Sequence, residues 1–275
     1  MSNAPYLSQS SRGGARIGHD SLNDHMFVDG LEDAFESNKL MGHFAENCAE
    51  KYQFTRSEQD NFAIHSLERA RLAQSDKLFG SEIVPIPVSS KNNERLIIED
   101  EQPRSAKVEK IPHLKPAFQA DGTVTAANSS SISDGAAALV LSSERSARDM
   151  EIPIRATIVG YAGHAHEANW FTTAPIFAVK KLLSQIGWHQ DEVDLWEINE
   201  AFAVVPMAFM REMKISSDRL NIRGGACALG HPIGASGARI VVTLLNALES
   251  ENLKKGIASI CLGGGEALAV AIERE

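Results

Sequence analysis

Cysteine, aromatic residues and positive charge are scarce in this sequence, and each scarcity excludes a class of protein. Among 275 residues there are only three cysteines, Cys48, Cys227 and Cys261, and aromatic residues make up 6%. A small, odd number of cysteines argues against a disulfide framework, so we expect reduced thiols. Acidic residues outnumber basic ones by 36 to 27. The resulting net charge of -9 argues against a nucleic-acid partner, whose phosphates require a basic face.

Long apolar runs are missing as well. No stretch approaches the roughly 18 residues of a membrane span, and the first twenty residues lack the apolar segment of a secretion signal. Hydrophobic residues still make up 43% of the chain and charged residues 23%, with 20 Gly and 10 Pro. This is the composition of a globular protein, and we expect it to be soluble, cytoplasmic and without a membrane partner.

The first part of the chain predicts a loop followed by two helices. Residues 4–24 are rich in Gly, Ser, Arg and Asn, which is typical of an extended surface loop. Apolar residues recur every four positions over 40–52 and predict an amphipathic helix. Thr55 and Glu58 have the spacing of a capping box, so a second helix is expected as far as about Gln74.

The remainder predicts alternating strands and helices, and therefore a layered α/β fold. Two prolines make 82–88 an edge strand at best, and 89–118 is a charged, proline-interrupted excursion. The unbroken apolar run 135–141 predicts a strand covered on both faces. Further helices are expected near 143–150, 176–186, 199–213 and 237–248, and strands near 156–161, 220–222, 257–262 and 267–272.

Two segments combine a strand or loop end with residues that can carry chemistry. In the first, Asn199 and Glu200 directly follow a predicted strand, where Asn either caps a helix or lines a site. The second, 224–239, holds five glycines and His231. Glycines allow close backbone approach to a ligand, but the segment has only part of a dinucleotide-binding spacing, so NAD is not expected. His231 has few packing neighbours there and is a candidate functional residue.

A third segment places Cys261 at a strand end before three glycines. A buried cysteine usually behaves as a small hydrophobic residue. Here we expect the glycines to expose the thiol and to offer backbone N–H groups to an oxyanion. Cys48 and Cys227 are interpreted as structural. A zinc site built from Cys227, His231 and Cys261 would have only three ligands, so no metal is expected.

Together, the three segments resemble those of the thiolase family. They are Asn199-Glu-Ala-Phe202, Gly230-His-Pro-Ile-Gly-Ala-Ser-Gly-Ala-Arg239 and Cys261-Leu-Gly-Gly-Gly265, in the order of the thiolase C-terminal motifs. Residues 41–46, 114–118 and 123–130 also resemble thiolase loop-domain segments. The resemblance implies an acyltransferase of fatty acid metabolism or beta-oxidation, closest to acetyl-CoA C-acetyltransferase. Such an enzyme interconverts two acetyl-CoA with acetoacetyl-CoA and CoA and needs no other cofactor.

The resemblance also implies a domain organisation. The expected architecture is an α/β thiolase fold, layered α-β-α-β-α, with an α+β loop domain. The N-terminal half-domain is expected to be largely missing, because no CGSG-like segment with the nucleophilic cysteine occurs. The expected parts are the end of a truncated N-terminal domain (1–3), a loop domain for CoA binding and tetramer formation (4–130), a further N-terminal piece (131–153) and the C-terminal domain (154–275). The full-length form is expected to be a homotetramer.

The family's catalytic roles match four residues. His231 would activate the nucleophilic thiolate and, with a water held by Asn199, bind the thioester oxygen. Cys261 would remove a proton from the acetyl methyl group, with its pKa lowered toward neutrality by the histidinium or by N–H donors. The Gly263 N–H would supply half of a second oxyanion site. The matches to the CoA and substrate tunnel are Met41, Arg104, Phe118, Ala126, Ser130, Ala201 and Phe202.

Two other functions stay open from the sequence. Without the nucleophile segment, the activity of this chain alone is doubtful. It would then be a non-catalytic acyl-CoA-binding protein, or a part that needs a complementary N-terminal chain. Leu40 and Phe171 stand where some thiolases carry other residues, so the acyl-chain preference also stays open.

Overall fold

A four-stranded sheet forms the centre of the computed structural model, which describes residues 1–14, 17–90 and 93–275. The strand order is β5-β8-β7-β6. Antiparallel pairs join β5 (Thr157–Ala165) to β8 (Glu266–Glu273) and β8 to β7 (Lys255–Leu262). The pair of β7 and β6 (Leu195–Ile198) is parallel and therefore needs a long crossover, which carries three α-helices.

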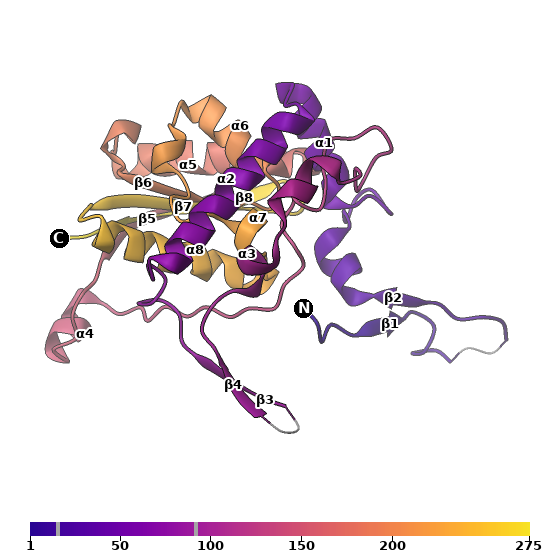
Figure 1. Cartoon of the computed structure of the whole chain (residues 1–275), viewed down its shortest axis with the longest axis horizontal. Coiled ribbons are helices and arrows are strands. Elements are labelled where there is room, and N and C mark those ends of the chain that lie inside the picture. The colour runs from indigo at the N-terminus through magenta and orange to yellow at the C-terminus, as the bar shows by residue number, and fades with distance from the viewer. Residues whose placement is uncertain (15–16, 91–92) are drawn as a thin grey trace.

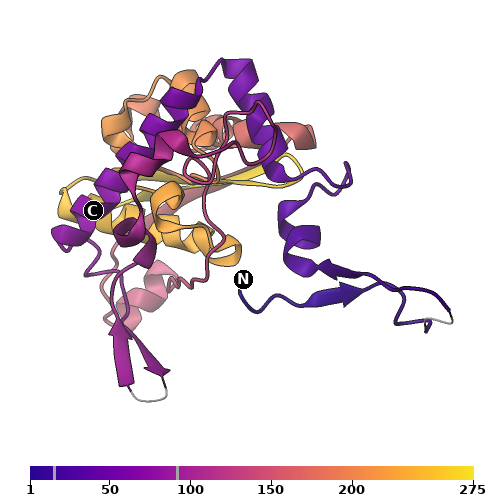
Figure 2. The ribbon, with the colours of Figure 1, turned by 45° about the vertical axis from the view of Figure 1, so that its right-hand side comes forward.

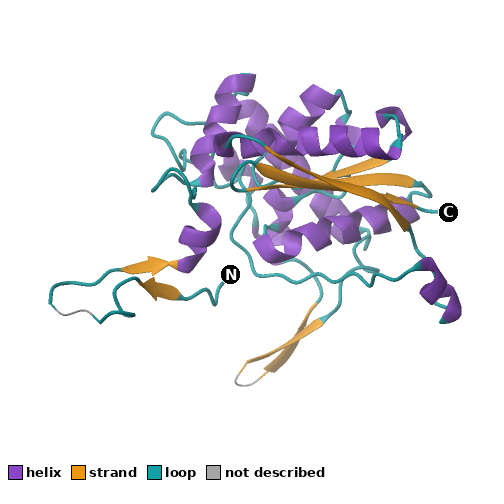
Figure 3. Ribbon diagram, turned by 180° about the vertical axis from the view of Figure 1, so that it is seen from behind, coloured by secondary structure: helices purple, strands orange, loops and turns teal. Residues whose placement is uncertain are grey.

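Helices cover both faces of this sheet (Figure 3). On one face, α5 (Ala174–Ile186) packs against β5 and β8, and α6 (Val204–Met213) lies beside α5. On the other face, α8 (Ile233–Ser250) packs against β6 and β7. The described residues thus form an α-β-α arrangement, which is three of the five predicted layers. None of the described helices is long and apolar enough to cross a membrane.

The two helices predicted in the first part are confirmed as α1 (Met41–Tyr52) and α2 (Arg56–Ser75). Thr55 and Glu58 form the predicted capping box, because each side chain accepts a hydrogen bond from the other residue's backbone N–H. The apolar side of α1 is buried in the main core with α5 and α6. That burial ties the first part of the chain to the sheet domain.

Two hairpins extend away from the main body (Figures 1 and 2). The first is formed by β1 (Tyr6–Ser8) and β2 (Leu22–Asp24), and the second by β3 (Ile86–Ser90) and β4 (Asn93–Ile97). The remaining short elements are η1 (Phe27–Leu31), α3 (Glu101–Ser105), η2 (Val108–His113), α4 (Glu144–Asp149), η3 (Ala168–Thr173), η4 (Gln190–Glu192), η5 (Ser217–Arg219) and α7 (Ala226–Leu229).

The hairpins change two of the predictions. The loop expected over 4–24 contains the paired strands β1 and β2, although its residues 15–16 lie outside the described part. The edge strand expected over 82–88 is confirmed as β3, shifted toward the C-terminus. Its partner β4 lies inside the charged excursion 89–118, of which residues 91–92 are outside the described part. Each strand pairs with a segment that is not adjacent to it in sequence, and the composition of one strand does not reveal its partner.

Two predicted strands are wrong. The apolar run 135–141 is extended but pairs with no strand in the described part, and Val140 is 94% exposed. An apolar run indicates a buried strand only where a sheet partner exists, which the run itself does not reveal. The strand expected at 220–222 is reduced to one bridge between Leu220 and Trp196. The other predicted helices and strands after residue 142 form close to their predicted bounds, except the start of α6.

Candidate active site

Asn199 is placed by the sheet and does not cap a helix. It directly follows β6, and its backbone N–H donates to the carbonyl of Ser259 on β7 at 3.0 Å. Its side chain is buried, with 1% of the residue exposed. The helix predicted from residue 199 begins only at Val204. The strand end fixes Asn199 because β6 is buried on both faces.

Residues 128–130 pair with the segment that follows Asn199, and this pairing brings four predicted substrate residues together. Both the backbone N–H and the hydroxyl of Ser130 donate to the carbonyl of Ala201, at 3.0 and 2.9 Å. Phe118 contacts Phe202 edge to face, with ring centroids 6.0 Å apart. Segments some 70 residues apart in sequence therefore lie against one another.

His231 lies two residues before the start of α8 and faces Asn199. Its Nε2 is 3.4 Å from Nδ2 of Asn199, and its Nδ1 is 2.6 Å from Oγ of Ser236. Its backbone N–H donates to the carbonyl of Ser131 at 3.1 Å. Gly230 just before it has φ of +93°, and a side chain there would collide with Ser133. The glycine thus permits the close approach that holds His231 in place.

The imidazole of His231 is neutral near pH 7. Burial, and secondarily the positive charge of Arg239, lower its pKa to about 4. The prediction that a histidinium lowers the pKa of Cys261 is therefore wrong for this structure. A neutral imidazole is instead suited to accept a proton from a thiol.

We expect this shifted pKa to make folding stability depend on pH. Between about pH 6.5 and 4 the unfolded chain binds a proton at His231 and the native chain does not, so stability falls as the pH falls through this window. The full effect is about 3 kcal/mol. Urea unfolding of wild type and His231→Gln between pH 7 and pH 4 tests this, and the difference between them should shrink toward low pH.

The matched control is His189→Gln, which replaces an exposed histidine and leaves the buried His231 in place. Burial raises the pKa of Glu197 to about 8, which opposes the trend in the wild type. Glu197 is present in every variant, so comparison between variants removes its contribution. A His231→Gln protein with the same pH dependence as wild type contradicts the prediction.

Cys261 is buried within β7 and is not exposed by its glycines. Only 6% of the residue is accessible, and it pairs with Ala267 of β8. Burial raises the pKa of its thiol to about 12. The predictions of an exposed thiol and a lowered pKa are therefore both wrong. The physical reason is that the glycines follow the thiol in the turn, while the side chain packs in the apolar core.

The three glycines instead form the tight turn between β7 and β8. Gly264 and Gly265 both have φ of +86°, and a side chain on Gly265 would collide with the carbonyl oxygen of His166. Gly263 lies beside Met41 of α1, because a Cβ on the glycine would be 3.5 Å from the methionine sulfur. The turn therefore brings Gly263 and Met41 together, although they are more than 200 residues apart.

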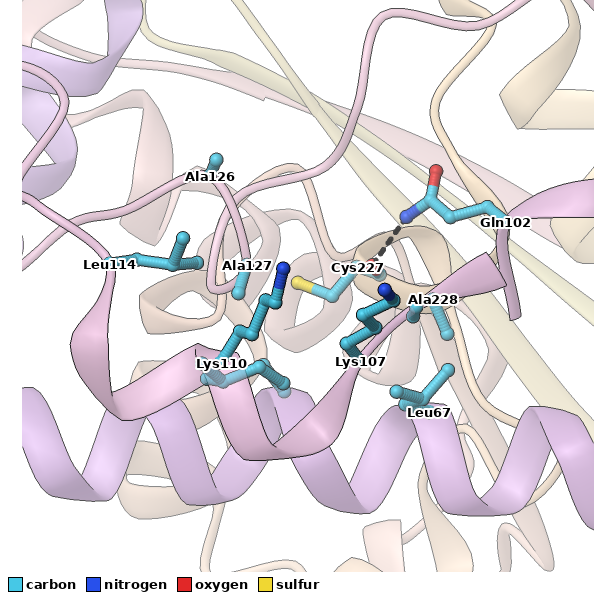
Figure 4. Close-up of a pocket in the computed structure, with 12 residues that line it drawn as sticks. Leu67, Gln102, Lys107, Lys110, Leu114, Ala126, Ala127, Cys227 and Ala228 are labelled. Atoms are coloured by element: carbon cyan, nitrogen blue, oxygen red, sulfur yellow. Dashed lines mark hydrogen bonds between the residues drawn. The ribbon is translucent and has the colours of Figure 1, made fainter. Parts of the chain in front are cut away.

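A pocket of about 320 Å³ lies between α2, η2 and α7 (Figure 4). Ala126, one of the predicted substrate residues, is part of its lining. Arg104 is exposed on α3 and does not line it, although Gln102 does and donates to the carbonyl of Cys227 at 2.9 Å. The lining also includes Lys107 and Lys110 at the rim, which sequence reasoning missed. The signal in the sequence that could have identified them is the close spacing of these two lysines in an otherwise acidic chain.

Glu200 is a second residue whose role the sequence did not reveal. Its buried carboxylate accepts from the Ser66 hydroxyl at 2.7 Å, the Asn221 amide at 2.8 Å and the Cys227 N–H at 3.1 Å. Burial raises the pKa of this carboxyl. The contacts join α2, the turn at residue 221 and α7, and so position the loop that carries His231. Among the described residues, no group of three or more His, Cys, Asp or Glu could hold a metal ion.

Comparison with known proteins identifies the family. The N-terminal domain model of thiolases matches residues 1–145, and the C-terminal domain model matches residues 152–274. The chain belongs to the thiolase family. A probable acetyl-CoA acetyltransferase from Dictyostelium discoideum is 44% identical over the whole chain, which spans 66% of that relative's length.

Solved structures agree with this assignment. Acetyl-CoA acetyltransferase from Bacillus anthracis is 40% identical, with a TM-score of 0.94 over 98% of this chain and 68% of its own. A thiolase from Ascaris suum in complex with coenzyme A is 41% identical, with a TM-score of 0.89 over 100% of this chain and 69% of its own. The predicted thiolase fold is confirmed.

The comparison corrects one part of the prediction. The expectation that the N-terminal half-domain is largely missing is not supported, because the N-terminal domain model matches residues 1–145 of this thiolase. The residues interpreted as loop domain thus lie within the match to that domain. The names of the matched relatives give no support to the doubt about activity, because acetyl-CoA acetyltransferases match nearly the whole of this chain. The chain spans only 66% and 68% of the lengths of these two proteins, so its own activity stays a prediction.

Proposed function

We propose that this thiolase transfers acetyl groups between CoA thioesters, converting two acetyl-CoA to acetoacetyl-CoA and CoA and back. The main observation that supports this proposal is the contact between His231 and Asn199. A neutral imidazole and an amide from two separate motifs meet at one place, where they can accept a proton and stabilise a thioester oxygen. The names of the matched relatives support acetyl as the acyl group.

The reaction divides into two steps, and over both steps each residue recovers its original protonation state. In the first, His231 takes the proton of a nucleophilic thiol, the thiolate attacks the thioester carbon, and the bond to CoA sulfur breaks. Burial holds Cys261 as a thiol, so it can protonate the departing CoA thiolate. In the second step, the Cys261 thiolate removes a methyl proton from another acetyl-CoA. The carbanion then attacks the acyl-enzyme, and the released enzyme thiolate recovers its proton from His231.

The native gene product, purified from its source with its intact mass measured, tests this function. We expect it to release CoA from acetyl-CoA and to cleave acetoacetyl-CoA when CoA is added. Measured binding of CoA without either reaction would instead favour an acyl-CoA-binding protein.

The same proposal includes the cytoplasmic location, the beta-oxidation context and the homotetramer. It also includes the domain bounds 1–3, 4–130, 131–153 and 154–275.

The basic rim of the pocket fits the phosphates of the proposed substrate. Lys107 and Lys110 line the same pocket as Ala126, and apolar side chains form most of the remaining wall (Figure 4). CoA combines a phosphorylated end with an uncharged pantetheine arm, and lysine ammonium groups bind phosphate as point charges. The Ascaris suum thiolase was solved with coenzyme A. We therefore include both lysines in the proposed CoA site.

Replacing both lysines should weaken binding of CoA but not of pantetheine. For the Lys107→Gln, Lys110→Gln protein we expect about tenfold weaker CoA binding, because two charge-assisted contacts at an exposed rim are lost. Calorimetric titration of the 275-residue chain with each compound measures this. Lys115→Gln is the matched control, since it removes the same charge nearby without touching the pocket. An equal loss for both compounds would show that the lysines do not contact phosphate.

A further inference from the structure

Ser236 contacts His231 on the side of the ring opposite Asn199. It lies wholly buried in α8, with Oγ 2.6 Å from Nδ1 of His231. The same hydroxyl donates to the carbonyl oxygen of Pro232 at 3.0 Å. A hydroxyl has one proton, and once it is donated to Pro232 the oxygen can only accept from the imidazole. In this arrangement the Nδ1 atom of His231 carries the ring proton.

Asn199 leads to the same conclusion from the other ring nitrogen. Its Nδ2 group, which can only donate, lies 3.4 Å from Nε2 of His231. A neutral imidazole has one N–H and one lone pair. This contact places the lone pair on Nε2, on the side that faces the end of β6 rather than the body of α8. Two independent contacts select one tautomer.

We propose that Ser236 is a positioning residue that holds His231 in the Nδ1–H tautomer and so keeps the lone pair on Nε2, the nitrogen that would accept a thiol proton. Ser236 does not touch a substrate, and it acts only through the ring. Groups that fix the tautomer of a catalytic histidine control its use as a base. The inference about the tautomer stands on the contacts alone, while the identity of the accepted proton rests on the proposed function.

Nitrogen NMR of the 275-residue chain labelled with ¹⁵N-histidine tests the tautomer directly. The signal of His231 is identified by its loss in His231→Gln. We expect a protonated Nδ1 and an unprotonated Nε2 in the wild type, a mixture in Ser236→Ala, and the wild-type pattern again in Ser236→Thr. A wild-type ring protonated on Nε2, donating to an Asn199 amide turned the other way, would overturn the proposal, and so would an unchanged ring in Ser236→Ala. The wild-type spectrum decides even if a variant does not fold.

Activity of the native enzyme gives the second readout. We expect Ser236→Ala to lower kcat/KM about 10- to 100-fold, as is typical of partners that orient a functional histidine. Thr243→Val removes another buried hydroxyl from the same helix, one that donates to Glu82, and should leave kcat/KM unchanged. If the NMR spectra show the expected tautomer but no thiolase reaction is found, the proposed function is wrong and the assignment of the tautomer remains valid. Equal rates in wild type and Ser236→Ala would overturn the positioning role.

Discussion

Purified as the 275-residue chain alone, the protein is expected to release no CoA from acetyl-CoA by condensation. All three of its thiols are buried: burial raises the pKa of Cys48 to about 11 and of Cys261 to about 12, and also raises that of Cys227. An activated nucleophile requires a hydrogen bond to its base. Among the described residues, none of the three thiols has a hydrogen bond to His231. Without an activated covalent nucleophile, the rate would be lower by about a million-fold.

Thiol release from acetyl-CoA, measured against a sample without protein, tests this expectation. The native gene product provides the positive comparison, and its intact mass shows whether it differs from the 29.8 kDa chain. Acetyl transfer from labelled acetyl-CoA to the protein provides a second measurement, because it requires only the first step. Condensation by the 29.8 kDa chain above the blank would show that one of its three thiols becomes the nucleophile when substrate binds.

Replacing Cys261 and His231 in the active enzyme should separate the two chemical steps. Cys261→Ala is expected to keep transfer of labelled acetyl to the protein but to lower exchange of the acetyl methyl hydrogens with deuterated water by about 1,000-fold, the usual contribution of a positioned base. His231→Ala should slow both reactions, because it removes the acceptor of the thiol proton and a neighbour of the thioester oxygen together.

Cys48→Ala is the matched control for the loss of a buried thiol. Cys48 lies on α1 in the same core as Cys261, and its replacement by Ala removes the same atom from a similar environment. We expect normal rates for it in both assays. Methyl exchange at the wild-type rate in Cys261→Ala would show that Cys261 is not the base, and the Cys261-to-Gly265 segment would then have a structural role.

The sequence determined the local elements that depend on short-range signals. The capping box of α2, the amphipathic pattern of α1 and the apolar strands β7 and β8 all lie close to their predicted bounds, because neighbouring residues decide helix caps and side-chain alternation. The motifs around Asn199, His231 and Cys261 also identified the family. Their glycines were informative because left-handed backbone conformations and close contacts are needed there.

Only the tertiary structure decided the environments of those same residues. The sequence suggested an exposed Cys261 with a lowered pKa, whereas packing in the main core buries it and raises its pKa. The run 135–141 has the composition of a buried strand but lies exposed and unpaired in the described chain. Desolvation and strand pairing depend on segments distant in sequence, so the residue types alone do not determine them. For this reason the motifs indicate the type of chemistry, whereas the fold determines which atoms lie in contact and in which protonation state.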